Sequence, residues 1–422
     1  MSVKVYIDGQ EGTTGLKILE RFKDRNDIEI MKIDEDKRKD NDERKKFICS
    51  SDFTFLCLPD AAAREAVELA KGSNVRIIDA STAHRTNPDW AYGFPELSKQ
   101  HREKIAASSR VAVPGCYASG FISLVYPLVK AGIMPSDYPV VAHAVSGYSG
   151  AGKKAIAVYE SDEKPEEFYS PRQYALPQEH KHLPEMMKIS GLDYKPVFNP
   201  LICDYFSGMV VTVPVLTRLL PKKYTLADIH KAFTEHYADA NLVKVMPVMG
   251  EGVLENGFLA ANTLSGKNNM EIFVCGNDDR IVLCSRLDNL GKGASGAAVQ
   301  CLMQKLRIYL YIGCDKSKHC SHIGIYHTTA LADTADVTGL AVKRKLYRKF
   351  LFACIGRHYR LARKRASVLT YAVYKRLDIV LHRVDRQLLS DNACRAYYHI
   401  VLINTEFVRT KLAHLLCDLN TV

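Results

Sequence analysis

The sequence predicts an α/β protein with two domains, the first built on a parallel sheet and the second an α+β domain on a mixed sheet. Three observations lead to this fold class. Short apolar strand patterns alternate with helical patterns up to about residue 116, which is typical of a parallel sheet with right-handed crossovers. Strand patterns outnumber helices after Pro139, and the composition changes abruptly at Arg307. At 422 residues, the chain is also longer than one hydrophobic core usually supports.

The first element is a strand over 3–7, and a glycine-rich turn over 8–15 joins it to a helical pattern that starts at Leu16. Glycines at this place let the backbone approach a pyrophosphate, whose charge is stabilised by the helix N-terminus. The turn therefore predicts a dinucleotide site, although glycine turns that bind no ligand share the pattern. The residues that we expect to contact the cofactor here are Gly9, Gly12, Thr13, Thr14 and Gly15.

A second strand over 28–33 is followed by a charged run over 34–39. An acidic residue after this strand usually holds the ribose 2′-hydroxyl of NAD, whereas a basic residue holds the 2′-phosphate of NADP. The run contains both kinds. Lys37 and Arg38 favour NADP(H) as the cofactor, and the alternative is a solvated charged loop.

Two further strands, over 53–59 and 75–79, flank a helix expected over 60–71. Leu58 and Pro59 end the first of these strands, and Ser81 follows the second. Because ligands of parallel sheets bind beyond the carboxyl ends of the strands, we expect Leu58 and Pro59 at the cofactor and Ser81 at the substrate.

An apolar run over 111–113 ends in Pro114–Gly115, Cys116 follows, and a helical pattern covers 120–130. Backbone N–H groups and the helix dipole at such a turn favour the thiolate form of a cysteine, which is its nucleophilic form. Cys116 is therefore a candidate nucleophile. The alternative is a free cysteine that packs in the core.

The second domain begins with a strand over 140–145 and a loop of small residues over 146–154, which includes Ser149 and is suited to surround an anion. Its other predicted elements are strands over 208–218, 243–249, 270–276 and 280–287 and a helix near 226–237.

Two histidines, His180 and His182, lie on one side of a segment that we expect to be extended. A neutral imidazole is the usual proton carrier near neutral pH, and the alternative is a solvated surface pair. The segment supplies too few ligands for zinc, so we expect no metal.

The small residues over 288–299 suit a helix that returns to the first domain. We therefore divide the chain into a cofactor domain over 1–116, completed by a helix at about 290–306, a substrate and oligomerisation domain over 117–289, and an extension over 307–422.

The extension accounts for the whole excess of positive charge, because it holds 20 Lys and Arg against 8 Asp and Glu, whereas the protein's net charge is +11. Its basic run at 357–365, interleaved with aromatic residues, is typical of nucleic-acid or membrane-surface segments. The alternative, which we favour, is a segment without a native fold, produced by a changed reading frame or a missed stop. Nucleic acid is a partner only if the extension is functional.

No signal peptide or long apolar run is evident, and the cysteines lack the spacing of a disulfide scaffold. We therefore expect a cytoplasmic protein with reduced cysteines and no membrane partner.

Four motifs together resemble the short-form N-acetyl-γ-glutamyl-phosphate reductases, a branch of the semialdehyde dehydrogenases, over about residues 1–306. The motifs are the Gly9/Gly12/Gly15 turn, Val113–Gly120, His180–Glu185 and Asp288–Gly293. The chain departs from the family at Ser119, where threonine is usual, and in its extension.

The resemblance implies that Cys116 is the nucleophile and His180 the general acid/base. It places Tyr174 and Glu185 near the site as substrate-binding residues, Asn289 near the nicotinamide carboxamide, and Arg85 beside the anionic end of the substrate. It implies NADPH-dependent reduction of N-acetyl-glutamyl 5-phosphate to the 5-semialdehyde through a cysteine thioester, in arginine biosynthesis. It also implies a dimer or tetramer formed through the sheet of the second domain.

Two other functions stay open. A related enzyme that reduces aspartyl phosphate shares the nucleophile and the hydride chemistry, although the His180–His182 segment and the loop over 149–154 favour the acetylglutamyl enzyme. A non-catalytic NADP-binding redox sensor uses Cys116 only as an oxidisable thiol.

Overall fold

A computed structural model describes residues 2–306, 308–309 and 326–327, all within the unit Met1–Thr329. The predicted extension over 307–422 lies outside the described residues, apart from β14 (Ile308–Tyr309) and β15 (Tyr326–His327), which pair antiparallel.

The first sheet is entirely parallel, with the strand order β2-β1-β3-β4-β6-β5. Its strands are β1 (Val3–Asp8), β2 (Ile28–Met31), β3 (Phe53–Leu56), β4 (Arg76–Asp79), β5 (Ala91–Tyr92) and β6 (Arg110–Ala112). The chain leaves β1 to one side for β2 and returns to the other side for β3. A crevice therefore opens beyond the carboxyl ends of β1 and β3, where ligands of such sheets bind.

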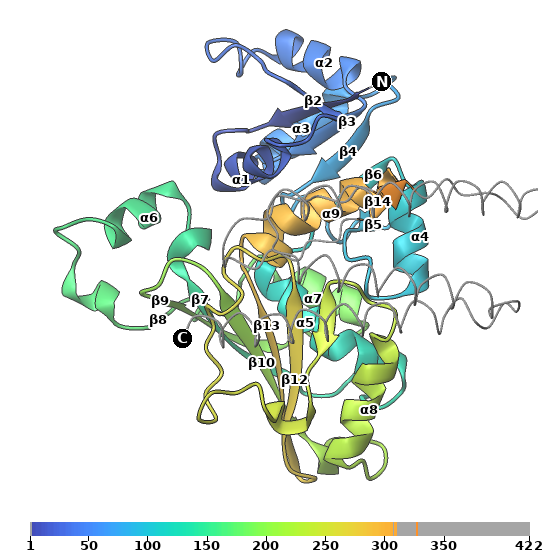
Figure 1. Cartoon of the computed structure of the whole chain (residues 1–422), viewed down its shortest axis with the longest axis vertical. Helices are drawn as coiled ribbons and strands as arrows, with labels where there is room; N and C mark the ends of the chain where they lie inside the picture. The colour runs from blue at the N-terminus through green and yellow to red at the C-terminus, as the bar shows by residue number, and fades with distance from the viewer. Residues whose placement is uncertain (1, 307, 310–325, 328–422) are drawn as a thin grey trace, which may run out of the picture. The chain divides into compact units, whose positions relative to one another are not determined.

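Helices cover both faces of this sheet, because successive strand residues point to opposite sides. Ile78 packs in one core with α1 (Thr13–Phe22), α4 (Lys99–Ala107) and α9 (Gly296–Lys305). Ile77 packs in the other core with α2 (Asn41–Ser50) and α3 (Asp60–Leu69). Figure 1 shows that α9, which follows the whole second sheet in sequence, lies beside the first sheet.

The second sheet is mixed, with the strand order β11-β12-β13-β10-β7-β9-β8. Its strands are β7 (Val141–Gly147), β8 (Arg172–Gln173), β9 (Val197–Cys203), β10 (Met209–Leu216), β11 (Val243–Val245), β12 (Met270–Gly276) and β13 (Arg280–Leu287). The β7–β9 and β11–β12 pairs are parallel, and the other pairs are antiparallel.

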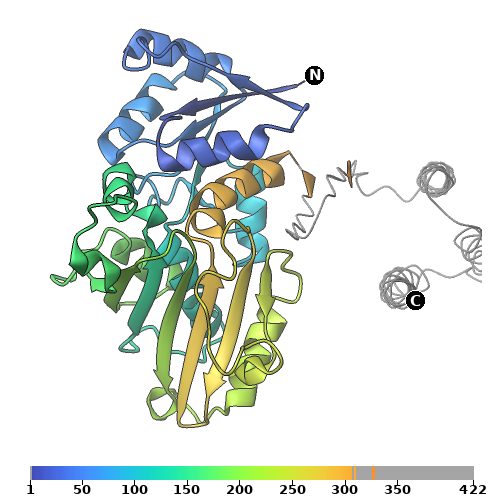
Figure 2. The same ribbon diagram turned by 60° about the vertical axis from the view of Figure 1, so that its left-hand side comes forward.

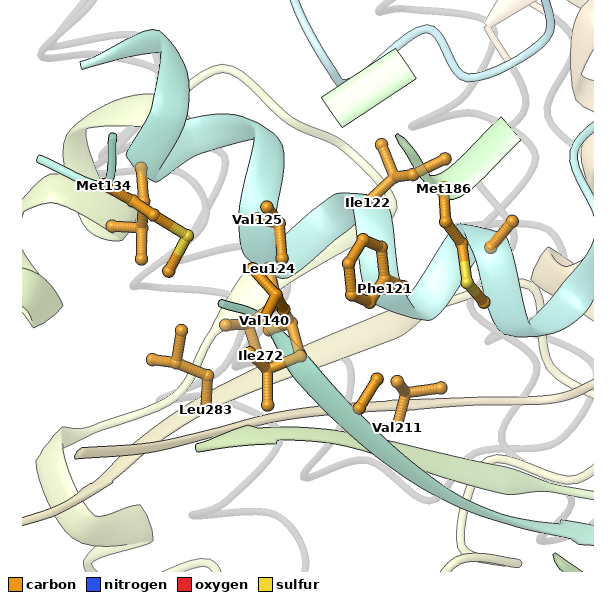
Figure 3. Close-up of a cluster of buried hydrophobic side chains, with 14 of the residues drawn as sticks. Phe121, Ile122, Leu124, Val125, Met134, Val140, Met186, Val211, Ile272 and Leu283 are labelled. Atoms are coloured by element: carbon orange, nitrogen blue, oxygen red, sulfur yellow. The ribbon is translucent and has the colours of Figure 1, made fainter. Parts of the chain in front are cut away.

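One face of this sheet carries the largest core. The helices α5 (Cys116–Lys130), α7 (Leu183–Ser190) and α8 (Leu226–His236) pack on it. Figure 3 shows Phe121 and Leu124 of α5 directed toward Val211 and Leu283 of the sheet. This packing fixes α5, and with it the cysteine at its first residue.

The chain between β7 and β8 forms a lobe that stands apart from the large core (Figure 2). It contains η1 (Tyr148–Gly150), α6 (Lys153–Tyr159) and η2 (Glu166–Tyr169). The guanidinium of Arg172 lies 3.4 Å from the ring centroid of Phe168, so the lobe has an aromatic centre of its own. The remaining short helices are η3 (Thr217–Leu219), η4 (Val248–Gly250) and η5 (Gly291–Ser295), the last a π-helix.

The predicted fold class is confirmed. Several details differ from the sequence analysis, and two of them concern the site and the second sheet. The helix expected over 120–130 begins at Cys116, so the cysteine lies in its first turn rather than in the loop before it. The strand β9 was not predicted, and it contains Pro200, a residue uncommon inside sheets. Among the described residues, no helix is both long and apolar enough to cross a membrane.

Candidate active site

A cavity of about 250 Å³ lies between the carboxyl edge of the first sheet and the loop that follows β7. Its lining residues are Gly12, Thr13, Thr14, Cys57, Leu58, Ala80, Ser149, Gly150, Gly152 and Leu290. Four residues predicted at the cofactor, Gly12, Thr13, Thr14 and Leu58, are therefore brought together, and Ser149 faces them from the second sheet. The cavity occupies the crevice at the reversal of strand order.

The glycine turn leaves no room for a side chain at Gly9 or at Gly15. Gly9 has φ of 85°, and a Cβ atom there would lie 2.4 Å from the carbonyl oxygen of Cys57. A Cβ atom on Gly15 would lie 2.6 Å from the carbonyl oxygen of Gly9. The bare backbone of the turn and the start of α1 therefore border the cavity, an arrangement that fits the pyrophosphate of a dinucleotide.

The two basic residues of the charged run differ in their surroundings. Arg38 forms an ion pair with Glu11, which belongs to the glycine turn, and a second one with Glu35 at 3.7 Å. Lys37 pairs with Asp34, at 3.4 Å, and is exposed. Of these two residues, Arg38 is therefore the one that lies against the turn.

Cys116 is half-buried at the first residue of α5, and the backbone N–H of Tyr117 donates a hydrogen bond to its sulfur. Burial raises the pKa of the Cys116 thiol, and the Tyr117 N–H, Arg85 and Lys181 oppose that rise. The helix start does favour the thiolate, as expected, through the Tyr117 N–H, but desolvation outweighs it and the two cations, so the pKa lies above its usual value.

Glu185 joins the elements around the cysteine. Its Oε1 accepts a hydrogen bond from Arg85 Nη1 at 2.7 Å, and its Oε2 accepts from the Tyr92 hydroxyl at 2.9 Å and the Gly115 N–H at 3.2 Å. Arg85 also donates to the carbonyl oxygens of Val113 and Ala80. Both charged groups are buried, so the pair fixes the Pro114–Gly115 turn from behind.

His180 and His182 lie in contact, with ring centroids 4.6 Å apart. The His180 ring also packs against Tyr117, the neighbour of Cys116, at 5.7 Å, and against Tyr174 at 5.8 Å. Burial, together with the nearby Lys181 and Arg85, lowers the pKa of His180 to about 4. His182 is 5 % exposed, and its Nδ1 has no hydrogen-bond partner among the described residues. The surface-pair alternative is thus excluded for both residues.

The amide of Asn289 holds the loop after β7. Its Nδ2 donates to Ser149 Oγ at 2.9 Å, and its Oδ1 accepts from the Gly208 N–H at 2.9 Å. Ser81 Oγ donates to Asp79 at 2.8 Å, within a turn after β4. Asn289 therefore reaches the cavity through Ser149, and the hydroxyl of Ser81 is engaged with its own loop.

Sequence reasoning missed the contacts of two residues in the Asp288–Gly293 motif. Gly293 of η5 packs on Cys116 so closely that a Cβ atom on it would lie 2.7 Å from the Cys116 Cβ. The next residue to its N-terminal side, Lys292, is buried and pairs with Glu96 at 2.7 Å. The glycine and lysine of this motif were visible in the sequence, but no local pattern shows what they contact. No group of three or more potential metal ligands occurs among the described residues.

Comparisons with known proteins first define the class of protein to which the chain belongs. Residues 4–106 match the NAD-binding domain of semialdehyde dehydrogenases, and residues 116–289 match their dimerisation domain. Similar solved structures include aspartate semialdehyde dehydrogenase II from Vibrio cholerae in complex with ASA, with 15 % identity and a TM-score of 0.55, covering 73 % of this chain and 99 % of that one. The enzyme from Francisella tularensis has 16 % identity and a TM-score of 0.53, with 71 % and 98 % covered. These structures share the fold of this chain.

The relatives that are similar in sequence define a narrower family within this class. Proteins named N-acetyl-gamma-glutamyl-phosphate reductase from Brucella ovis and Brucella melitensis are each 47 % identical over 304 residues, which cover 71 % of this chain and 97 % of theirs. The chain therefore belongs to the N-acetyl-γ-glutamyl-phosphate reductase family. It is an oxidoreductase with a nicotinamide-dinucleotide domain.

Proposed function

We propose that the protein reduces N-acetyl-glutamyl 5-phosphate to N-acetyl-glutamate 5-semialdehyde with NADPH, in arginine biosynthesis. The observation that carries this proposal is the placement of Cys116 at the start of α5, beside a pair of neutral histidines and in the same fold unit as the dinucleotide cavity. The names and the 47 % identity of the relatives support the choice of substrate.

NADP(H) is the proposed cofactor because Arg38 lies against the glycine turn, where it can meet a 2′-phosphate by exchanging its Glu11 partner. The turn holds the pyrophosphate with backbone N–H groups, and Leu58 and Pro59 border the cofactor at the end of β3. Asn289 orients Ser149 at the opposite wall of the cavity.

Cys116 is the proposed nucleophile. Its sulfur forms a bond to the acyl carbon of the substrate, the carbon–oxygen bond to phosphate breaks, and the thiol proton leaves with the phosphate. Lys181 and Arg85 are the cations that favour the thiolate as the sulfur attacks. When bound, the reduced nicotinamide supplies the hydride that converts the thioester to the aldehyde.

The chain must stabilise the acyl oxygen in both halves of the reaction. The backbone N–H groups at the start of α5 and a proton-bearing nitrogen of His180 are the proposed donors to that oxygen. Breakage of the carbon–sulfur bond then returns the thiolate and releases the aldehyde. Tyr174 borders the substrate, and Arg85 and Glu185, which were expected to contact it, act as positioning residues through the Gly115 turn.

We also propose the domain division given above, with a boundary at about residue 116, a homo-oligomer formed through the second sheet, and a cytoplasmic location.

The test is the reverse reaction, followed as NADPH formation from the semialdehyde, phosphate and NADP⁺ by wild-type protein and Cys116→Ser. We expect Cys116→Ser to lose turnover almost entirely while it still binds NADPH, measured by fluorescence, because a serine alkoxide is a poor leaving group. Turnover within about tenfold of wild type, a barrier difference of ~1.4 kcal/mol, contradicts the assignment of the nucleophile. Faster turnover with aspartate semialdehyde than with N-acetyl-glutamate 5-semialdehyde contradicts the proposed choice of substrate.

A further inference from the structure

The backbone amide of His182 donates a hydrogen bond to Nδ1 of His180, with a nitrogen–nitrogen distance of 3.1 Å. A backbone N–H can only donate, so Nδ1 of His180 must present its lone pair. In a neutral imidazole the proton then sits on the other ring nitrogen, Nε2. The peptide chain itself thus selects the tautomer.

The surroundings of His180 keep its ring neutral. A second proton would have to bind at Nδ1, where it would face the His182 N–H and break the hydrogen bond. Tyr117 of α5, Tyr174 and Phe198 of β9 pack around the ring, and none of them is a carboxylate that could pair with an imidazolium. The charged groups that act on it, Lys181 and Arg85, are both cations, and with burial they lower the pKa of His180 to about 4.

We propose that His180 acts as a fixed neutral Nε2–H donor to the acyl oxygen, and that it does not accept the proton of Cys116. This inference rests on the proposed function and deepens the role of one residue in it. His182 is a positioning residue in this scheme, because its amide sets the tautomer of its neighbour.

The proton balance of the reaction is met without proton transfer to the ring. In the first half, the thiol proton departs with phosphate as the sulfur–carbon bond forms and the carbon–oxygen bond breaks. In the second half, the hydride that the bound cofactor would supply reduces the thioester carbon, breakage of the carbon–sulfur bond releases the thiolate, and the thiolate takes up one proton from water to restore the thiol. The acyl oxygen is negatively charged only while the acyl carbon is tetrahedral, and a donated hydrogen bond stabilises the oxygen most in that state.

Two matched substitutions of His180 distinguish a side chain that donates a hydrogen bond from one that acts as a base. The amide nitrogen of Gln can occupy the place of Nε2, whereas the amide nitrogen of Asn falls at the place of Nδ1. We expect His180→Gln to keep kcat/KM within about tenfold of wild type and His180→Asn to lose about 10²- to 10³-fold, the usual effect of removing one oxyanion donor. Equal, large losses in both variants overturn the proposal, because neither amide can act as a base.

Nuclear magnetic resonance of the full wild-type chain reports the tautomer independently of turnover. With ¹⁵N-labelled histidine, the signals missing in His180→Gln identify the ring. We expect a protonated Nε2 and an unprotonated Nδ1 that stay unchanged from about pH 5.5 to about pH 8.5, since an unperturbed imidazole titrates near pH 6.5. A protonated Nδ1, or titration near pH 6.5, overturns the inference, and does so even if the protein proves to reduce a different acyl phosphate.

Discussion

Replacement of Gly293 by alanine tests whether the close packing of η5 on Cys116 sets the position of the sulfur. The added methyl carbon would lie 2.7 Å from the Cys116 Cβ and 3.1 Å from both the Cys116 Cα and the Asp288 carbonyl oxygen. Carbon atoms in contact prefer separations of about 3.5–4.0 Å, so the cysteine or the π-helix must move by roughly 1 Å. A displacement of this size at a reacting atom lowers kcat by about 10²-fold, and overpacking costs about 1–3 kcal/mol of stability.

The assay measures kcat at saturating substrate, the rate of Cys116 alkylation by iodoacetamide, and the free energy of unfolding in urea. Gly72→Ala is the matched control. Gly72 has φ of 79° and no heavy atom within 4 Å of its Cβ position, so alanine there strains the backbone by about 1–2 kcal/mol without touching the site. We expect both variants to lose stability and only Gly293→Ala to lose activity. A Gly293→Ala variant that keeps kcat within about threefold of wild type would refute this reasoning.

Two further predictions concern the buried charges around the site. Glu185→Gln leaves Arg85 without its anion and should lower the free energy of unfolding by about 3–5 kcal/mol in urea titrations. The control Glu179→Gln, at an exposed residue, should change this free energy little. Similar values for the two variants would show that the ion pair does not hold the turn. Burial and the nearby cations lower the pKa of His182 well below its usual value, so below about pH 6.5 the unfolded chain binds a proton that the folded protein excludes. The contribution of His182 to the free energy of unfolding is then fully present above about pH 7, and it falls by about 1.4 kcal/mol per pH unit as the pH drops below 6.5. A free energy of unfolding that is equal at about pH 7.5 and about pH 5 would contradict this pKa shift.

The parts of the fold that sequence reasoning predicted are those encoded locally. The turn over 8–15 follows a strand and precedes a helix, and its residues Gly12, Thr13 and Thr14 line one cavity with the strand-end residue Leu58. The strands over 270–276 and 280–287 were predicted with the bounds that the structure has, because their alternation and apolar content are strong. By contrast, α2 has few apolar residues and a run of charged ones, so no helical apolar face was visible in its sequence.

The parts that sequence reasoning could not supply depend on contacts between distant segments. Glu185 and Arg85 are 100 residues apart in sequence, and Asn289 and Ser149 are 140 apart. Each of these side chains was assigned to a ligand, yet the structure shows that its polar atoms bind other parts of the chain. The rise in the pKa of Cys116 also depends on contacts between distant segments. The sequence places it at a helix start, but the burial that outweighs the helix dipole depends on the packing of α7 and η5.

The position of α9 has a consequence for how the protein is made. Ala297, Val299 and Leu302 of this helix fill the core of the first sheet beside Val5, Ile18 and Phe55. During synthesis, the strands of that sheet leave the ribosome long before the helix that covers them. A nascent chain therefore exposes an apolar sheet face until nearly 300 residues have emerged, so chaperones have an extended period in which to bind it.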